Sequence, residues 1–180
     1  MSYLFTPNLI YPLKNYKVNS YKFKQKTTYD KVFWGLHLGE DINCKAGTSV
    51  CAVGRGKVVY SSLNAKKDKK KNWGNIVVIA HKNPKTKKVF YSLYAHLAKR
   101  LVKKGNSVEQ GKKIGVIGKA NTISNGWWEE THLHFAVYFG EWKNKNKILP
   151  GYFRADQKRT KLSDWARPSE FIKKYAKIEI

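Results

Sequence analysis

The sequence predicts an all-β domain, built mainly from antiparallel strands, with one short helix near its C-terminal end. Short runs rich in β-branched and aromatic residues recur along the chain, which is typical of strands. Glycine-containing gaps separate these runs, and regular helical periodicity is scarce. The expected strands span residues 49–53, 56–61, 75–81, 89–96, 113–118 and 132–139.

The segments around these strands are less regular. Residues 1–30, rich in Tyr and Lys, are compatible with an additional edge strand. Residues 143–164 are polar, basic and aromatic, and we interpret them as an inserted loop. Residues 169–175 follow Pro168, and the Pro-Ser pair is well suited to begin a helix.

Length and composition indicate one folded domain. The 180 residues are 42% hydrophobic and 14% aromatic, which argues against disorder. Because no repeat or flexible linker interrupts the chain, we predict a single domain over residues 1–180, with its core at about 9–140 and a C-terminal segment at 165–180. No stretch approaches the roughly 20 apolar residues of a membrane span, and we expect a monomer.

The charge is strongly basic, with 36 Lys and Arg against 12 Asp and Glu and a net charge of +24. Such a field favours polyanions, among them nucleic acid, anionic lipid, teichoic acid and the carboxylates of peptidoglycan. The densest run, residues 66–71, is interpreted as a solvated loop, with a nonspecific grip on a polyanion as the alternative. No sequence-specific nucleic-acid binding is expected.

Two short stretches contain most of the candidate metal-binding and catalytic residues. In GLHLGEDI, residues 35–42, the side chains of His37 and Asp41 would share one face of a strand, because strand side chains alternate. Gly39 between them leaves room, and the glycines disfavour a helix. In THLHF, residues 131–135, two histidines share a face while their neighbours point towards an apolar core.

These residue types suit a catalytic zinc site, which usually takes three protein ligands and leaves one position for water. His37, Asp41 and one of His132 and His134 would make a His-Asp-His set. The two remaining histidines, one of them His96, could act as a general base or as donors to a developing oxyanion.

Other candidate residues receive structural interpretations. His81 stands at the end of an apolar strand, where a histidine is more often structural than a ligand. Cys44 and Cys51 flank an expected hairpin turn, and their spacing does not suit a cysteine-based zinc site. We expect small buried side chains there or a non-essential disulfide bridge.

The chain resembles the lysostaphin/LytM-type zinc peptidases, a family of peptidoglycan endopeptidases. The resemblance runs through residues 9–140 and, more weakly, 165–172. It implies the lysostaphin-like fold of the duplicated-hybrid-motif type. Matching motifs follow one another in the family's order at residues 35–42, 45–50, 74–81, 93–97, 108–115 and 132–135.

Carried over residue by residue, the resemblance implies one Zn²⁺ per chain, held by His37, Asp41 and His134. It implies that His96 and His132 activate the water or stabilise the tetrahedral intermediate. Tyr29 corresponds to an upstream tyrosine that assists the intermediate in some relatives.

The sequence also departs from the family pattern. The segment before the His-Leu-His run, residues 121–130, is longer than usual and contains Trp127 and Trp128. We expect it to border the substrate groove, where it would alter substrate choice or cover the metal. Ala136 replaces the family's usual Glu, and the segment 143–164 is longer than usual.

The resemblance implies a zinc-dependent endopeptidase that cleaves peptide cross-links or stems of peptidoglycan and acts on the cell wall. The filled five-residue site disfavours a non-catalytic or latent wall-binding or amidase-activating module, which stays the first alternative. A basic nucleic-acid-binding protein is the second. Residues 1–7 lack the pattern of a signal peptide, which leaves release by lysis, an unusual export route or a missing leader.

Overall fold

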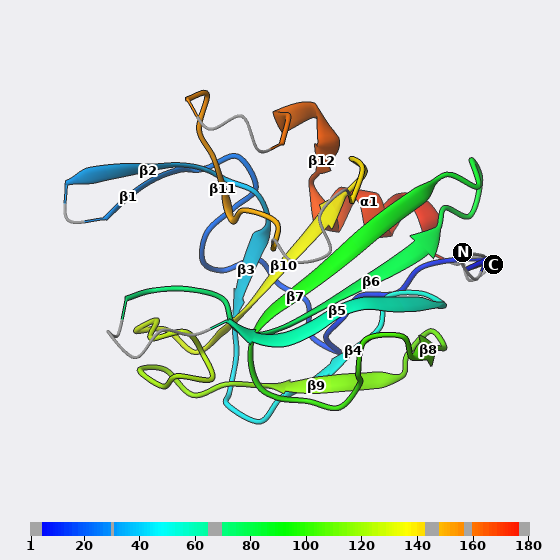
Figure 1. Cartoon of the computed structure of the whole chain (residues 1–180), viewed down its shortest axis with the longest axis horizontal. Coiled ribbons are helices and arrows are strands. Elements are labelled where there is room, and N and C mark those ends of the chain that lie inside the picture. Colours follow the sequence, from blue (N-terminus) through cyan, green and yellow to red (C-terminus); the bar gives the residue numbers. More distant parts are fainter. Residues whose placement is uncertain (1–4, 30, 65–69, 143–147, 157–159, 177–180) are drawn as a thin grey trace.

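The computed structural model describes residues 5–29, 31–64, 70–142, 148–156 and 160–176. Two sheets and a short helix make up this part of the chain (Figure 1). The strands are β1 (Lys26–Tyr29), β2 (Val32–His37), β3 (Glu40–Asn43), β4 (Ser49–Cys51), β5 (Gly56–Asn64), β6 (Gly74–Lys82), β7 (Val89–Arg100), β8 (Ser107–Val108), β9 (Lys113–Ile117), β10 (His132–Tyr138), β11 (Tyr152–Phe153) and β12 (Trp165–Ala166). A 3-10 helix spans Leu162–Asp164, and α1 spans Pro168–Tyr175.

The larger sheet has nine strands, and its main path runs β12-β10-β7-β6-β5-β8. Strand β3 pairs with β10, while β9 joins β7 to β4. All pairings between these strands are antiparallel. The expected all-β, mainly antiparallel fold with a short C-terminal helix is therefore confirmed.

The central strands are buried on both faces, which explains their nearly continuous apolar sequences. Along β6, Val77 and Ile79 pack into one core, and Ile76 and Val78 pack into the other on the opposite face. Alternating side chains of β10 divide in the same way, with Leu133, Phe135 and Val137 in the first core. The His132 and His134 side chains therefore lie on the second face, as the strand period predicts.

The smaller sheet has the order β1-β2-β11 and projects from one side of the larger one (Figure 1). Lys26–Tyr29 supply its edge strand, as expected for the N-terminal segment. Part of the segment interpreted as a loop, residues 143–164, is instead ordered by pairing, because Tyr152 and Phe153 align with His37 and Leu36 of β2. Residues 143–147 and 157–159 of that segment lie outside the described residues.

The expectation that His37 and Asp41 lie on one strand is wrong. His37 and Asp41 do not share a strand, because β2 ends at His37 and β3 begins at Glu40. The two strands belong to different sheets, and the chain turns from one to the other at Leu38 and Gly39. The side chains of His37 and Asp41 are still brought together, but by tertiary structure rather than by the strand period.

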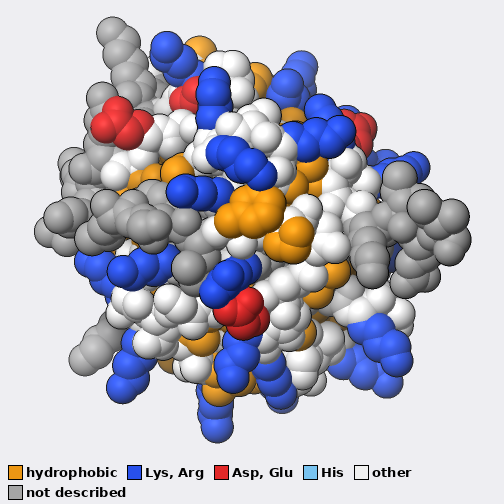
Figure 2. Space-filling view, turned by 90° about the vertical axis from the view of Figure 1, so that its right-hand side faces the viewer, with side chains coloured by type: hydrophobic (Ala, Val, Ile, Leu, Met, Phe, Trp, Pro, Cys, Tyr) orange, Lys and Arg blue, Asp and Glu red, His pale blue; other side chains and the backbone are white. Residues whose placement is uncertain are grey.

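The surface reflects the basic composition. Figure 2 shows Lys and Arg side chains scattered across one face, with a few exposed apolar side chains among them. Cys44 and Cys51 are free thiols, each partly buried, so the bridge considered above is not formed. Among the described residues, no helix is long and apolar enough to cross a bilayer.

Candidate metal site and groove

Three buried side chains meet where the two sheets join. The imidazole Nε2 of His37 lies 3.0 Å from Nδ1 of His134 and 3.4 Å from Oδ1 of Asp41. The same carboxylate oxygen lies 2.9 Å from Nδ1 of His134. The register explains this contact, since Asp41 of β3 stands directly opposite His134 of β10. This triangle is a group of ligand atoms that could hold a metal ion.

The triangle suits a tetrahedral zinc site in size and in donor chemistry. Metal–ligand bonds of about 2.0–2.2 Å place tetrahedral ligand atoms roughly 3.3–3.6 Å apart, close to the separations found here. The other ring nitrogen of His37, Nδ1, lies 3.3 Å from the carbonyl oxygen of Lys22. A carbonyl can only accept, so the proton sits on Nδ1 and the lone pair of Nε2 points into the triangle, the arrangement typical of a metal-ligating histidine.

The His134 ring occupies a site that Gly39 leaves open. A Cβ at Gly39 would lie 2.7 Å from both Cε1 and Nε2 of the His134 ring. Nε2 itself is buried and has no hydrogen-bond partner among the described residues. In the free protein Nδ1 of His134 lies within hydrogen-bond distance of Oδ1 of Asp41 and Nε2 of His37. A cation at the centre of the triangle would instead coordinate these three atoms together.

The electrostatics of the site keep Asp41 and His134 in the protonation states that could bind a metal ion. Burial opposes ionisation of Asp41, but His37 and His134 beside it outweigh burial and hold the pKa of the carboxyl well below its usual range. Burial lowers the pKa of His134 to about 4, against the opposing effect of Asp41. At neutral pH the carboxylate is therefore ionised and the His134 imidazole is neutral.

His96 and His132 lie beside the triangle, with ring centroids 4.5 Å apart. Nδ1 of His96 lies 2.8 Å from the carbonyl oxygen of Asn125, and Nδ1 of His132 lies 3.1 Å from that of Glu130. Both protons are therefore on Nδ1, which leaves the Nε2 atoms as acceptors. Burial, reinforced by His132 and His134, holds the pKa of His96 well below its usual range.

A bulge in β7 aims the His96 side chain at this site. Tyr94 packs into the first core and Ala95 into the second, so regular alternation would return His96 to the first core. Instead His96 has a φ of 64°, and the register between β6 and β7 shifts at Asn75. Such left-handed geometry costs about 1–3 kcal/mol and is found where a site needs it.

The segment before β10 positions both of these histidines. Asn125 is fully buried, and its side-chain amide donates to the Glu130 carbonyl at 3.2 Å. Its Oδ1 accepts from the backbone N–H of Trp128 at 2.9 Å. One residue thus links the carbonyl that holds His96 to the carbonyl that holds His132.

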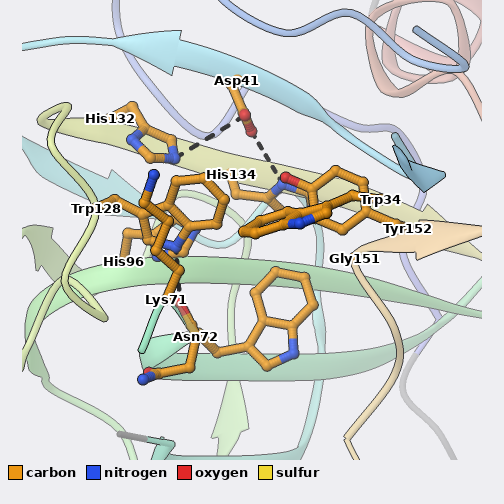
Figure 3. Close-up of a pocket in the computed structure, with 11 residues that line it drawn as sticks. Trp34, Asp41, Lys71, Asn72, His96, Trp128, His132, His134, Gly151 and Tyr152 are labelled. Carbon is orange, nitrogen blue, oxygen red and sulfur yellow. Dashed lines mark hydrogen bonds and ion pairs between the residues drawn. The ribbon is translucent and has the colours of Figure 1, made fainter. Parts of the chain in front are cut away.

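His96, His132 and His134 line a hollow of about 220 Å³ whose other walls are largely aromatic (Figure 3). A second hollow of about 120 Å³ adjoins it and shares Trp34, Lys71 and Trp128 with the first. The residues that line the first hollow are Trp34, Asp41, Lys71, Asn72, Trp73, His96, Trp128, His132, His134, Gly151 and Tyr152.

The structure therefore brings together all five residues of the predicted site, and two of the three further predicted residues line the hollows beside it. Trp128 lines both hollows, as expected of a groove-bordering segment. Tyr29 lines only the second hollow, where its hydroxyl donates to Glu129 at 3.3 Å. Trp127 has a φ of 65° and lines neither hollow. His81 is buried away from the site and is held by Ser92 and by the Arg55 carbonyl, in agreement with a structural role.

Sequence reasoning missed six residues that line the first hollow, namely Trp34, Lys71, Asn72, Trp73, Gly151 and Tyr152. Trp73 directly precedes the motif at residues 74–81, and this adjacency was an available signal. Lys71 ended a lysine run interpreted as solvated, although residues 66–69 of that run lie outside the described residues. Nothing local distinguished Trp34 or Tyr152.

The fold and this cluster define a β-domain with a buried His-Asp-His group that could hold a metal ion, and comparison with known proteins identifies the class. Residues 35–150 match the model of peptidase family M23. The match covers more than half of the chain, which therefore belongs to this family.

Two relatives show that proteins named as enzymes and as enzyme activators both resemble this chain. The chain is 35% identical over 99 residues to the peptidoglycan DD-endopeptidase ShyC of Vibrio cholerae, covering 55% of this chain and 19% of ShyC. It is 32% identical over 117 residues to the murein hydrolase activator NlpD of Escherichia coli, covering 64% of this chain and 27% of NlpD. The chain thus spans well under half the length of these relatives.

Solved structures agree on the fold. A zinc-containing peptidase from Vibrio cholerae aligns with 71% of this chain and 35% of its own, at 32% identity and a TM-score of 0.54. The catalytic domain of lysostaphin from Staphylococcus simulans aligns with 86% of this chain and 90% of its own, at 24% identity and a TM-score of 0.57. The expected lysostaphin-like peptidase fold is confirmed.

Proposed function

We propose that this protein is a zinc-dependent endopeptidase that hydrolyses peptide cross-links or stems of bacterial peptidoglycan. The observation that carries the proposal is the triangle of His37, Asp41 and His134, whose three ligand atoms lie 2.9–3.4 Å apart in a buried site. The 32% identity to a zinc-containing peptidase supports zinc as the metal.

Zinc bound by these three residues would lower the pKa of a water molecule to about 7 and polarise a scissile carbonyl. The chain supplies the proton carriers. His96 is neutral at neutral pH and its Nε2 is an acceptor, so it can take a proton from the attacking water. His132 is oriented in the same way by the Glu130 carbonyl and is suited to assist in proton transfer on the same side of the site.

The surroundings support a peptide substrate attached to an anionic wall. Aromatic rings of Trp34, Trp73 and Trp128 line the hollow and can pack on the backbone of a bound peptide. The net charge of +24 would favour retention on peptidoglycan and its anionic polymers. We therefore propose the cell wall as the place of action and a monomer as the working form.

Mass spectrometry of peptidoglycan fragments tests the proposal. Purified peptidoglycan of several cross-link chemistries is incubated with the protein, and His134→Ala serves as the control. New peptide termini that are absent from the control would establish the endopeptidase and name the bond. Absence of fragments from every substrate, with one zinc per chain measured by elemental analysis, would contradict it.

The similarity to NlpD favours a second candidate, a non-catalytic module that activates another murein hydrolase. The complete set of His and Asp side chains weighs against it, because an activator needs no activated water. The two candidates separate when the protein is added to a murein amidase. Stimulation of the amidase that persists in His134→Ala, without new peptide termini, would support the activator.

A further inference from the structure

Lys71 is a lysine held in place at the edge of the groove. Its side chain is only 10% exposed. Its Nζ lies 3.3 Å from the ring centroid of Tyr29 and 5.0 Å from that of Trp128. Contacts of an ammonium with two aromatic faces stabilise it in one place, and each contributes more as water is excluded.

The anion beside Lys71 is held less firmly. Oε2 of Glu129 lies 2.7 Å from the Lys71 ammonium, and the Tyr29 hydroxyl donates to Oε1 of the same carboxylate at 3.3 Å. The Glu129 side chain, however, is 56% exposed. Ion pairs with an exposed partner contribute roughly 0–1 kcal/mol, so another carboxylate can replace that of Glu129 at little cost.

The Lys71–Glu129 ion pair lies close to the candidate metal site. Lys71 lines both hollows, and it shares each of them with Asp41, Trp128 and His132. Figure 3 shows these residues around the first hollow. The remaining acidic side chain of the second hollow, Glu130, accepts a hydrogen bond from the Ser20 hydroxyl at 3.0 Å. A ligand carboxylate at Lys71 would thus lie in the groove that leads to the His cluster.

We propose that Lys71 and the Tyr29 hydroxyl form a subsite for a free carboxylate of the substrate peptide, and that the Glu129 carboxylate occupies it in the free protein. The inference rests on the proposed function, because peptidoglycan stem peptides carry free carboxylates. The ligand class is a peptide with an ionised side-chain or α-carboxylate near the scissile bond. Binding exchanges one carboxylate for another at a cation that does not move.

Binding of two matched peptides to the protein tests this proposal. The probes are synthetic cross-linked stem peptides that differ only in whether the glutamate α-carboxyl group is free or amidated. A charge-assisted hydrogen bond predicts about tenfold tighter binding of the free carboxylate by titration calorimetry. Lys71→Met should abolish this preference, Lys71→Arg should retain most of it, and Glu129→Gln should tighten binding of the free carboxylate several-fold.

Lys87→Met is the matched control. Nζ of Lys87 also lies over an aromatic ring, 3.7 Å from the centroid of Phe5, but in the turn between β6 and β7, at the end of these strands away from the site. This variant should keep the wild-type preference. Equal affinity of the wild type for both peptides, no affinity for either, or a preference that survives in Lys71→Met overturns the proposal.

Cleavage of the same peptides separates this inference from the proposed function. A wild type that discriminates in binding but cleaves neither peptide would contradict the peptidase and leave the subsite in place. A Glu129→Gln variant could instead change cleavage of both peptides by the same factor and leave the preference for the free carboxylate unchanged. The Lys71–Glu129 ion pair would then only connect two loops. That result would overturn the carboxylate subsite.

Discussion

Replacement of Gly39 by alanine should displace the proposed metal ligand His134 without removing any donor atom. A Cβ at this position would lie 2.7 Å from Cε1 and Nε2 of His134 and 2.7 Å from the carbonyl oxygen of Phe135. These separations are well below ordinary van der Waals contact. The Phe135 carbonyl cannot yield easily, because β10 is paired on both sides, with β3 and with β7. The His134 ring must therefore move.

The size of the effect follows from these contacts. Forcing one extra carbon into packed surroundings costs about 1–3 kcal/mol of folding free energy. Displacing a ligand from its supported orientation typically costs 10–100-fold in metal affinity. We expect Gly39→Ala to lose stability in that range and to weaken zinc binding by at least about tenfold.

Competition with a chromogenic chelator measures the zinc affinity, and urea unfolding measures the stability. Gly47→Ala is the control, because Gly47 has a φ of 82° and nothing within 4 Å of its Cβ position. It should lose about 1 kcal/mol from backbone strain and keep its zinc affinity. Wild-type zinc affinity in Gly39→Ala would refute the geometry described for His134.

Three further predictions address the site and the fold. His134→Ala should lose bound zinc and activity together, whereas His132→Ala should lose activity and keep much of the metal; the reverse pattern in elemental analysis would mean that the two roles are exchanged. Asn125→Ala removes the amide that links the backbone carbonyls bound by His96 and His132, so kcat should fall by about tenfold or more with zinc content unchanged. An unchanged kcat would show that these carbonyls orient the two histidines without the Asn125 amide. Burial lowers the pKa of His81 to about 4, and the Arg55 carbonyl only partly opposes this. Between pH 6.5 and 4 the unfolded chain therefore binds a proton that the folded protein does not. The free energy of unfolding should decrease by up to about 3 kcal/mol as the pH is lowered from 6.5 to 4. His81→Gln should reduce this pH dependence, as measured by urea unfolding at each pH.

The outcome at the first motif shows how local patterns succeed and fail. Strand alternation correctly placed His132 and His134 on one face of β10, because that strand is regular and buried on both sides. The same rule was wrong for His37 and Asp41, where the chain leaves one sheet and enters another within the motif. Alternation would also have sent His96 into the wrong core, had a bulge not turned it.

The fold class, the family and the residues of the His cluster could be predicted from the sequence, because short-range spacing and ordered motifs carry that information. Which atoms face one another, and which side chains surround them, depends on how distant segments pack. The groove wall joins Trp34 of β2, Lys71 before β6, Trp128 before β10 and Tyr152 of β11. Contacts between segments so distant in the chain arise from sheet pairing and core packing, and no local pattern encodes them.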